Sequence, residues 1–120
     1  MKYLSLFSGI GGFEQGIKQS GVDMQCIGFS EVDAHAKSIY LKHFPDHRDW
    51  GDATEIKTEE LPKFDFLVGG FPCQAFSIAG KRKGFDEARG TLFFEIARIL
   101  KDKQPKYFLF ENVGGLLSHD

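Results

Sequence analysis

The chain opens with a short apolar run that stops at a cluster of glycines. Residues 3–7, Tyr-Leu-Ser-Leu-Phe, precede Gly9, Gly11 and Gly12, and a helical pattern of apolar residues begins at Phe13. A run this short that ends at glycines is typical of a buried parallel strand. The sequence therefore predicts a strand, a tight glycine turn and a helix, the unit from which α/β folds are built.

Strands and helices are predicted to alternate along the rest of the chain. Further strands are expected at 24–29, around Trp50, at 64–68 and at 106–110, and helices from Asp33 to Phe44 and from Thr91 to Lys103. This alternation implies a parallel sheet with right-handed crossovers. The 22 residues from Gly69 to Gly90 carry no predicted element. Because loops rarely exceed about 12–15 residues, this segment is either functional or contains a misassigned element, and its content favours function.

Length and composition fit one globular domain. The 120 residues are 42% hydrophobic and 27% charged, and the net charge of −2 excludes a generally basic nucleic-acid coat. No apolar stretch approaches the ~20 residues of a membrane span, and the first apolar run ends too early for a signal peptide. Cys26 and Cys73 form neither a CxxC pair nor a disulfide-rich pattern. We expect a cytoplasmic protein.

The first glycine cluster stands where open α/β sheets bind nucleotide-like ligands. The dinucleotide pattern GxGxxG fails because its third glycine falls on Glu14, and no phosphate-binding GxxxxGK[ST] loop is present. A nicotinamide enzyme is therefore disfavoured, while a glycine turn needed only for packing remains an alternative. Glu31, at the end of the second predicted strand, could accept hydrogen bonds from a ribose, although the helix dipole also favours an acid there.

Cys73 is a candidate nucleophile. A lone cysteine is more often an inert buried residue. Here Pro72 restricts Phe71 to extended geometry, and the neighbours Gln74 and Ser77 make a poor core environment. A thiol at the carboxyl end of a strand, near helix N-termini, can have a lowered pKa and attack as a thiolate.

A basic cluster follows Cys73, and an acid follows the last predicted strand. The cluster consists of Lys81, Arg82, Lys83 and Arg89. It is either a solvated turn or, beside a thiolate, a loop that closes over a phosphate backbone. Glu111 and Asn112 are either solvated or part of a site. The four histidines form no metal set, since Pro45 separates His43 from His47.

Six segments, taken in order, resemble the motifs of DNA (cytosine-5)-methyltransferases. They are FSGIGGF, GFSEVD, GDAT, GGFPCQAFS, RGTLFFE and ENV. The resemblance runs from about Lys2 to Asp120 and is to the N-terminal catalytic portion of a bacterial restriction-modification enzyme. It implies a Rossmann-like class I methyltransferase fold with strand order 3-2-1-4-5 and helices on both faces. It also implies S-adenosylmethionine as methyl donor and duplex DNA as substrate.

The same resemblance suggests roles for particular residues. Cys73 would be the covalent nucleophile and Glu111 the acid that contacts the target base, with Pro72 and Asn112 positioning them. The expected cofactor-binding residues are Phe7, Gly9, Ile10, Gly11, Gly12, Glu31, Val32, Asp52, Ala53 and Leu92. The expected DNA-binding residues are Gln74, Ser77, Lys81, Arg82, Lys83 and Arg89.

Two departures from the family pattern stand out. Ser5 occupies a position where the family often has Asp, and residues 1–120 lack the later arginine motif, the target-recognition region and the closing C-terminal motif. The apolar strand at 106–110 would then have an unpaired outer edge. We expect either a complementary C-terminal polypeptide or the missing remainder of the chain to cover it. The alternative is a non-catalytic fragment of methyltransferase ancestry that binds cofactor or DNA and regulates.

Overall fold

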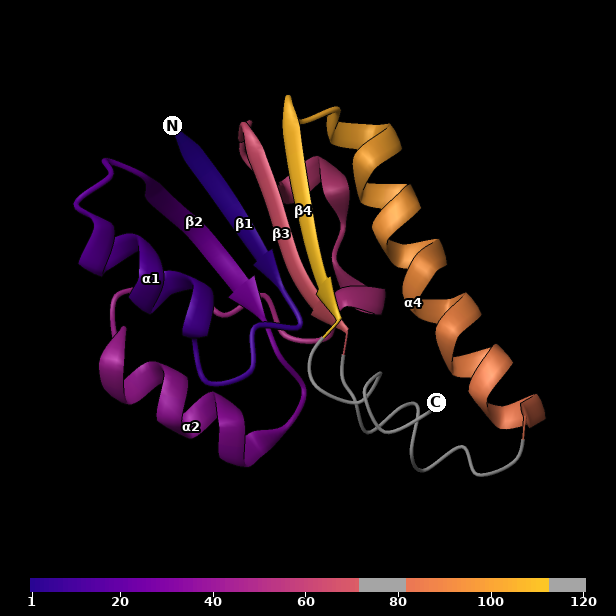
Figure 1. The fold of residues 1–120 in the computed structure, drawn as a ribbon. Coiled ribbons are helices and arrows are strands. Elements are labelled where there is room, and N and C mark those ends of the chain that lie inside the picture. The colour runs from indigo at the N-terminus through magenta and orange to yellow at the C-terminus, as the bar shows by residue number, and fades with distance from the viewer. Residues whose placement is uncertain (72–81, 113–120) are drawn as a thin grey trace.

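One parallel sheet of four strands organises the chain (Figure 1). The computed structural model describes residues 1–71 and 82–112, with side chains for residues 1–70 and 93–110. The strands are β1 (Lys2–Leu6), β2 (Gln25–Ser30), β3 (Phe66–Phe71) and β4 (Tyr107–Asn112). They lie in the order β2-β1-β3-β4, and every pairing is parallel. The α/β class predicted from the alternation of elements is confirmed.

The strand predicted around Trp50 is reduced to one parallel bridge between Phe29 and Asp49, on the outer side of β2. The predicted order 3-2-1-4-5 therefore holds, with its first member represented by this bridge. The segment stops pairing at Gly51, whose φ of 77° departs from the extended conformation. The Trp50 ring lies over β2. Its Nε1 donates to the carbonyl of Ile27 over 3.1 Å, and a Cβ at Gly28 would collide with the ring.

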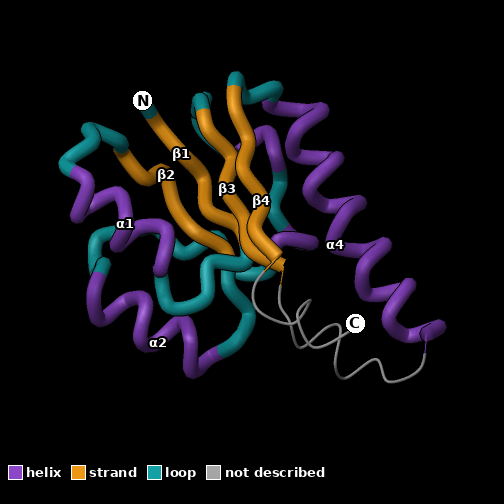
Figure 2. The backbone as a smooth tube through the Cα atoms, viewed as in Figure 1, coloured by secondary structure: helices purple, strands orange, loops and turns teal. Residues whose placement is uncertain are grey.

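Helices cover both faces of the sheet (Figure 2). Helix α1 (Gly12–Ser20) packs Phe13 on Tyr3 of β1, and helix α2 (Ala34–His43) stacks Tyr40 on Phe29 of β2. Helix α4 (Arg82–Lys103) packs on the other face, where Leu4 points, because successive strand residues face opposite sides. Two short 3-10 helices, η1 (Ala53–Glu55) and η2 (Thr58–Glu60), lie under the same face as α4. No helix in the described ranges is both long and apolar enough to cross a membrane.

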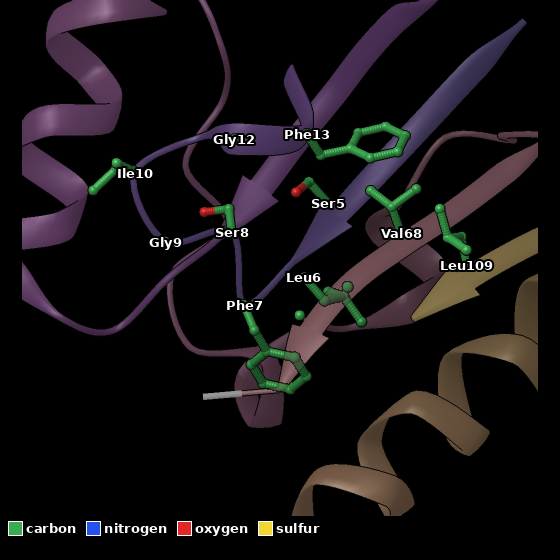
Figure 3. A pocket seen from close by; sticks show the side chains of 12 residues that line it. Ser5, Leu6, Phe7, Ser8, Gly9, Ile10, Gly12, Phe13, Val68 and Leu109 are labelled. Atoms are coloured by element: carbon green, nitrogen blue, oxygen red, sulfur yellow. The ribbon is translucent and has the colours of Figure 1, made fainter. Parts of the chain in front are cut away.

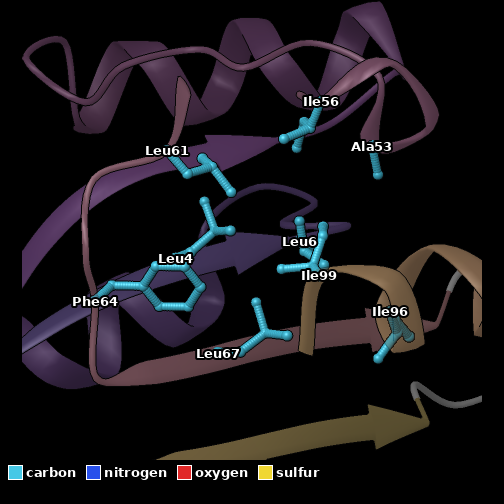
Figure 4. Packing of buried hydrophobic residues seen from close by; sticks show 9 residues of the cluster. All are labelled: Leu4, Leu6, Ala53, Ile56, Leu61, Phe64, Leu67, Ile96 and Ile99. Carbon is cyan, nitrogen blue, oxygen red and sulfur yellow. The ribbon is translucent and has the colours of Figure 1, made fainter. Parts of the chain in front are cut away.

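The main core lies between the sheet, α4 and residues 53–64, which contain η1 and η2 and are called the η segment below (Figure 4). Its buried members are Leu4, Leu6, Ala53, Ile56, Leu61, Phe64, Leu67, Ile96 and Ile99. Hydrogen bonds from side chains of α4 to backbone carbonyls border this core. Arg98 of α4 donates to the carbonyls of Ile56 at 2.8 Å and Ala53 at 3.1 Å, and Lys103 donates to the carbonyl of Leu61 at 2.7 Å. These side chains fix α4 to the η segment.

The prediction of one long loop from Gly69 to Gly90 is wrong at both ends. Strand β3 continues through Gly69 and Gly70 to Phe71, because hydrogen bonds from β1 and β4 on its two sides outweigh the poor strand propensity of glycine. Helix α4 begins at Arg82, nine residues before the predicted start at Thr91.

The early start of α4 corrects the placement of the basic residues. Arg82, Lys83 and Arg89 lie on the helix and not in a loop, whereas Lys81 falls outside the described residues. Gly84 and Gly90, each unfavourable in a helix by about 1 kcal/mol, conceal the helical pattern there. Basic residues are themselves good helix formers.

Candidate functional site

The glycine loop after β1 has an unusual backbone. Phe7 has φ 53°, a left-handed conformation that bulky side chains rarely adopt and that tends to mark functional sites. Gly11, the N-cap of α1, has φ 92°, and a Cβ there would lie 2.9 Å from the Phe44 ring and 3.0 Å from the Tyr40 ring. Position 11 therefore requires glycine both for its conformation and for its contact with α2.

A pocket of about 370 Å³ lies between this loop and the carboxyl ends of β1, β3 and β4 (Figure 3). It is lined by Ser5, Leu6, Phe7, Ser8, Gly9, Ile10, Gly12, Phe13, Val68, Gly69, Gly70 and Leu109. Four of the predicted cofactor residues are among them, namely Phe7, Gly9, Ile10 and Gly12. The carboxyl ends of parallel strands are where open α/β sheets bind ligands.

Glu31 joins the glycine loop to the start of α2. Its Oε1 accepts a hydrogen bond from the Gly9 N–H over 2.7 Å, and its Oε2 accepts one from the Asp33 N–H over 2.9 Å. Asp33 in turn caps α2 by accepting from the His35 N–H over 3.0 Å. Each Glu31 oxygen keeps a lone pair for a further donor, so the carboxylate is held in place and still able to bind a hydroxyl.

Other predicted cofactor residues lie apart from the pocket. The Asp52 carboxylate accepts from the Thr54 N–H over 2.9 Å and caps η1, and Ala53 is buried in the core. Val32 is 68% exposed beyond Glu31. Leu92 belongs to α4, and its side chain lies outside the described residues.

The pairing of β3 with β4 brings two predicted catalytic segments to neighbouring strand ends. Gly70 is in register with Glu111, and Phe71 is in register with Asn112. Pro72, Cys73, Gln74 and Ser77 follow Phe71 and fall outside the described residues, as do the side chains of Glu111 and Asn112. Gly70 and Leu109 line the pocket, so both strand ends border it.

Sequence reasoning gave no role in the site to three buried polar side chains, of which Ser5 and Ser8 line the pocket and Glu14 lies in the first turn of α1. Ser5 and Glu14 are each 2% exposed, and the Oγ of Ser8 is buried without a hydrogen-bond partner. The only signal in the sequence is their position. Ser5 lies inside an apolar run, Ser8 lies beside the first glycine, and Glu14 lies in the first turn of a predicted helix. Within the described part of the chain, no three His, Cys, Asp or Glu side chains gather as a metal site would require.

Comparison with known proteins finds that this chain is similar in sequence to DNA methyltransferases. The chain is 52% identical over its full length to the orphan methyltransferase M.SPRI of Bacillus phage SPR and 43% identical to the type II methyltransferase M.HhaI of Haemophilus parahaemolyticus. It spans 28% and 36% of those two proteins.

The fold is similar to solved methyltransferase structures. Spodoptera frugiperda DNMT2, as a triple mutant, gives a TM-score of 0.69 at 25% identity over 98% of this chain and 37% of its own. The Entamoeba histolytica methyltransferase EhMeth gives 0.72 at 22% identity over 98% and 39%. The profile of C-5 cytosine-specific DNA methylases matches residues 1–120. The chain therefore belongs to the C-5 cytosine-specific DNA methylase family.

Proposed function

We propose that this chain forms the N-terminal catalytic portion of an enzyme that transfers a methyl group from S-adenosylmethionine to carbon 5 of cytosine in duplex DNA. The reaction proceeds through a covalent bond between Cys73 and a flipped-out base, in a restriction-modification system. The observation that carries this proposal is the register of β3 and β4, since it sets the strand end that leads to Cys73 beside Glu111. Membership of the family supports the reaction class.

The pocket fits a nucleoside cofactor of this kind. Its glycine loop brings backbone close to the ligand, and the Glu31 carboxylate has lone pairs free for ribose hydroxyls. The buried, unpaired Oγ of Ser8 offers one more polar contact. S-adenosylmethionine supplies an electrophilic methyl group on a sulfonium. Phe7, Gly9, Ile10 and Gly12 would hold it against the carboxyl end of β1.

Catalysis requires the target cytosine outside the duplex, at a cost of a few kcal/mol. The Cys73 thiolate adds to carbon 6 of the ring, and the electron pair of the C5–C6 double bond makes carbon 5 nucleophilic. Glu111 hydrogen-bonds ring nitrogen 3 and stabilises the charge that develops there. Carbon 5 takes the methyl group as the sulfur keeps the bonding pair. Loss of the carbon 5 proton then restores the double bond and expels Cys73.

Contacts with DNA are proposed for the segment between β3 and the first turns of α4. Gln74, Ser77 and Lys81 precede the helix, and Arg82, Lys83 and Arg89 lie on it. Lysine and arginine contacts to phosphate position a protein on a duplex without reading its sequence. Phosphate contacts of these basic side chains would therefore orient the base-flipping segment.

A C-terminal part, either a complementary polypeptide or the remainder of the same chain, is proposed to complete the enzyme. Strand β4 is the last of the described sheet and carries three exposed apolar residues, Tyr107 at 53%, Phe108 at 63% and Leu109 at 45%. An open apolar sheet edge favours association. The relatives M.SPRI and M.HhaI are roughly three to four times as long as the matched segment, and the chain spans 28% and 36% of them.

A methyl-transfer assay tests the proposal. Labelled S-adenosylmethionine and duplex DNA are incubated with the 120-residue chain alone, and with the chain co-expressed with the C-terminal remainder of a relative such as M.SPRI. We expect label in 5-methylcytosine only in the second case. Label on another base, or none with the complement in a stably folded complex, would contradict the proposed function.

A further inference from the structure

The first turn of α1 carries a buried carboxyl group to which the mechanism above gives no role. It lines a second pocket, of about 350 Å³, together with Tyr3 and His47. Glu14 stands in the first turn of α1 and is 2% exposed. Neither of its carboxyl oxygens has a hydrogen-bond partner. An unpaired buried polar group costs about 1–3 kcal/mol, and in a native structure it calls for an explanation.

Hydroxyl groups lie beside this carboxyl, and one of them, that of Ser5, also lines the pocket of the glycine loop. Ser5 faces the same side of the sheet as Tyr3, against which Phe13 of α1 packs. Burial raises the pKa of Glu14, and the neighbouring hydroxyls of Ser5 and Tyr40 act against that rise without reaching hydrogen-bond geometry. The Tyr40 hydroxyl is already 2.7 Å from Nδ1 of His47. Ser5, on β1, lines the pocket together with Ser8 (Figure 3). Ser5 is thus the polar group that separates Glu14 from a bound ligand.

We propose that Glu14 is a positioning residue that acts through Ser5 on the amino-acid end of the cofactor, an inference that rests on the proposed function. When the ligand is bound, the Ser5 hydroxyl turns to donate its hydrogen to the Glu14 carboxyl. Its own oxygen lone pairs then point into the pocket, where they accept a hydrogen bond from the ammonium group of the ligand. The unpaired Ser8 hydroxyl provides a second polar contact at the same end.

The carboxylate of the amino-acid end would bind at the start of α1. Helix α1 begins at Gly12, and its N-cap Gly11 makes no side-chain hydrogen bond to the first turn. The free N–H groups and the helix dipole favour a carboxylate there. An ammonium beside Ser5 and a carboxylate at the start of α1 match the two charges of an α-amino acid. Adenine and ribose carry neither of these charges.

Two ligands that differ only in the amino-acid end provide the test. S-adenosylhomocysteine and 5′-methylthioadenosine share adenine, ribose and a neutral sulfur, and only the first carries an amino acid. Their binding to the chain in complex with its C-terminal complement is measured by calorimetry. We expect Ser5→Ala and Glu14→Leu to weaken S-adenosylhomocysteine roughly ten- to a hundredfold, the loss of a charge-assisted hydrogen bond, and to leave methylthioadenosine unchanged.

Two further variants separate positioning from general packing. Glu14→Gln keeps an acceptor oxygen for Ser5 and should bind S-adenosylhomocysteine close to the wild-type affinity. Ser20→Ala removes a hydroxyl that donates to the Ile17 carbonyl over 2.8 Å, at the other end of α1, and should change neither ligand. Thermal unfolding of each complex identifies any variant that fails to fold, and Ser5→Ala decides the question if Glu14→Leu does not fold.

The outcomes are distinct. Equal weakening of both ligands by Ser5→Ala, or unchanged binding of S-adenosylhomocysteine, would overturn the role of the Ser5–Glu14 pair. The role would also be overturned if Glu14→Gln bound S-adenosylhomocysteine as weakly as Glu14→Leu does. An acceptor oxygen at position 14 would then not be enough to position Ser5. A wild-type complex that binds neither nucleoside would instead contradict the proposed function.

Discussion

The Gly9 N–H donates to Oε1 of Glu31 over 2.7 Å, so the acid at the end of β2 holds the glycine loop that follows β1. Two segments separated in sequence by the whole of α1 are thereby tied together at the edge of the pocket. The second Glu31 oxygen binds the Asp33 N–H, at the start of α2. A ligand hydroxyl bound by Glu31 would therefore meet a carboxylate whose orientation is already fixed.

Glu31→Ala should weaken S-adenosylmethionine binding by about 1.5–3 kcal/mol, or roughly ten- to a hundredfold, because one or two charge-assisted hydrogen bonds to the ribose are lost. The Gly9 N–H also loses its acceptor. Calorimetry on the complemented protein measures the change. Asp23→Ala, an exposed acid between α1 and β2, serves as the control. Unchanged binding by Glu31→Ala would refute the assignment.

Cys73→Ser should abolish a covalent adduct with DNA that contains 5-fluorocytosine, since fluorine at carbon 5 blocks the elimination step and traps the wild-type enzyme. Cys26→Ser is the matched control. The Cys26 thiol donates to the Gly28 carbonyl at 3.3 Å, and burial raises its pKa, so it is a poor nucleophile. Denaturing electrophoresis separates the adduct. Its survival in Cys73→Ser would exclude Cys73 as the attacking group.

Glu111→Gln should retain cofactor binding and lose methyl transfer. Glu111 lies in register with Gly70 at the end of β4. Glu31 follows β2, at the opposite edge of the described sheet. A glutamine cannot supply the proton or the charge that stabilises ring nitrogen 3. Calorimetry and single-turnover methylation are compared on the same preparation. Loss of cofactor binding together with activity would assign Glu111 to the cofactor site instead.

Local patterns predicted most elements, and tertiary contacts decided the rest. The apolar run before the glycines and the Asp33 cap are local signals, and the structure confirms the strand and the helix they predict. The start of α4 was missed because Gly84 and Gly90 interrupt the helical pattern. The strand at Trp50 was overestimated because the extended backbone ends at Gly51, whose φ is 77°.

The candidate site divides in the same way. The glycine loop and Glu31 follow from their position at strand ends, and the structure brings them into contact. Burial of Glu14 could not be predicted, because an acid in the first turn of a helix is also favourable when exposed. Only the packing of α1 and α2 against the sheet removes that carboxyl from water.

The pH dependence of stability should change in Glu14→Gln. Burial raises the pKa of Glu14 above its ordinary value of 4.5, so the folded state binds this proton more tightly than the unfolded chain. That contribution to stability is fully present below 4.5 and is lost as pH rises through the folded-state pKa. The Tm of the wild type should therefore fall relative to that of Glu14→Gln as the pH rises above 4.5 and through the folded-state pKa. Glu59→Gln, at an exposed site on η2, should show no such change, and a constant difference for Glu14→Gln would contradict the prediction.

Phe108→Lys should have opposite effects on the isolated chain and on the complemented enzyme. Phe108 is 63% exposed on β4, which among the described strands pairs only with β3. A lysine on an open edge strand opposes aggregation, so the variant chain alone should remain monomeric at higher concentration. Burial of a phenylalanine is worth about 1.5–3 kcal/mol, so loss of that contact should weaken association with the C-terminal complement roughly ten- to a hundredfold.

Sedimentation velocity measures both the self-association of the Phe108→Lys chain and its affinity for the complement. Val22→Lys, at a residue 57% exposed between α1 and β2, is the control for added charge. Equal affinity of Phe108→Lys and wild type for the complement would show that this edge of the sheet is not the one the partner covers.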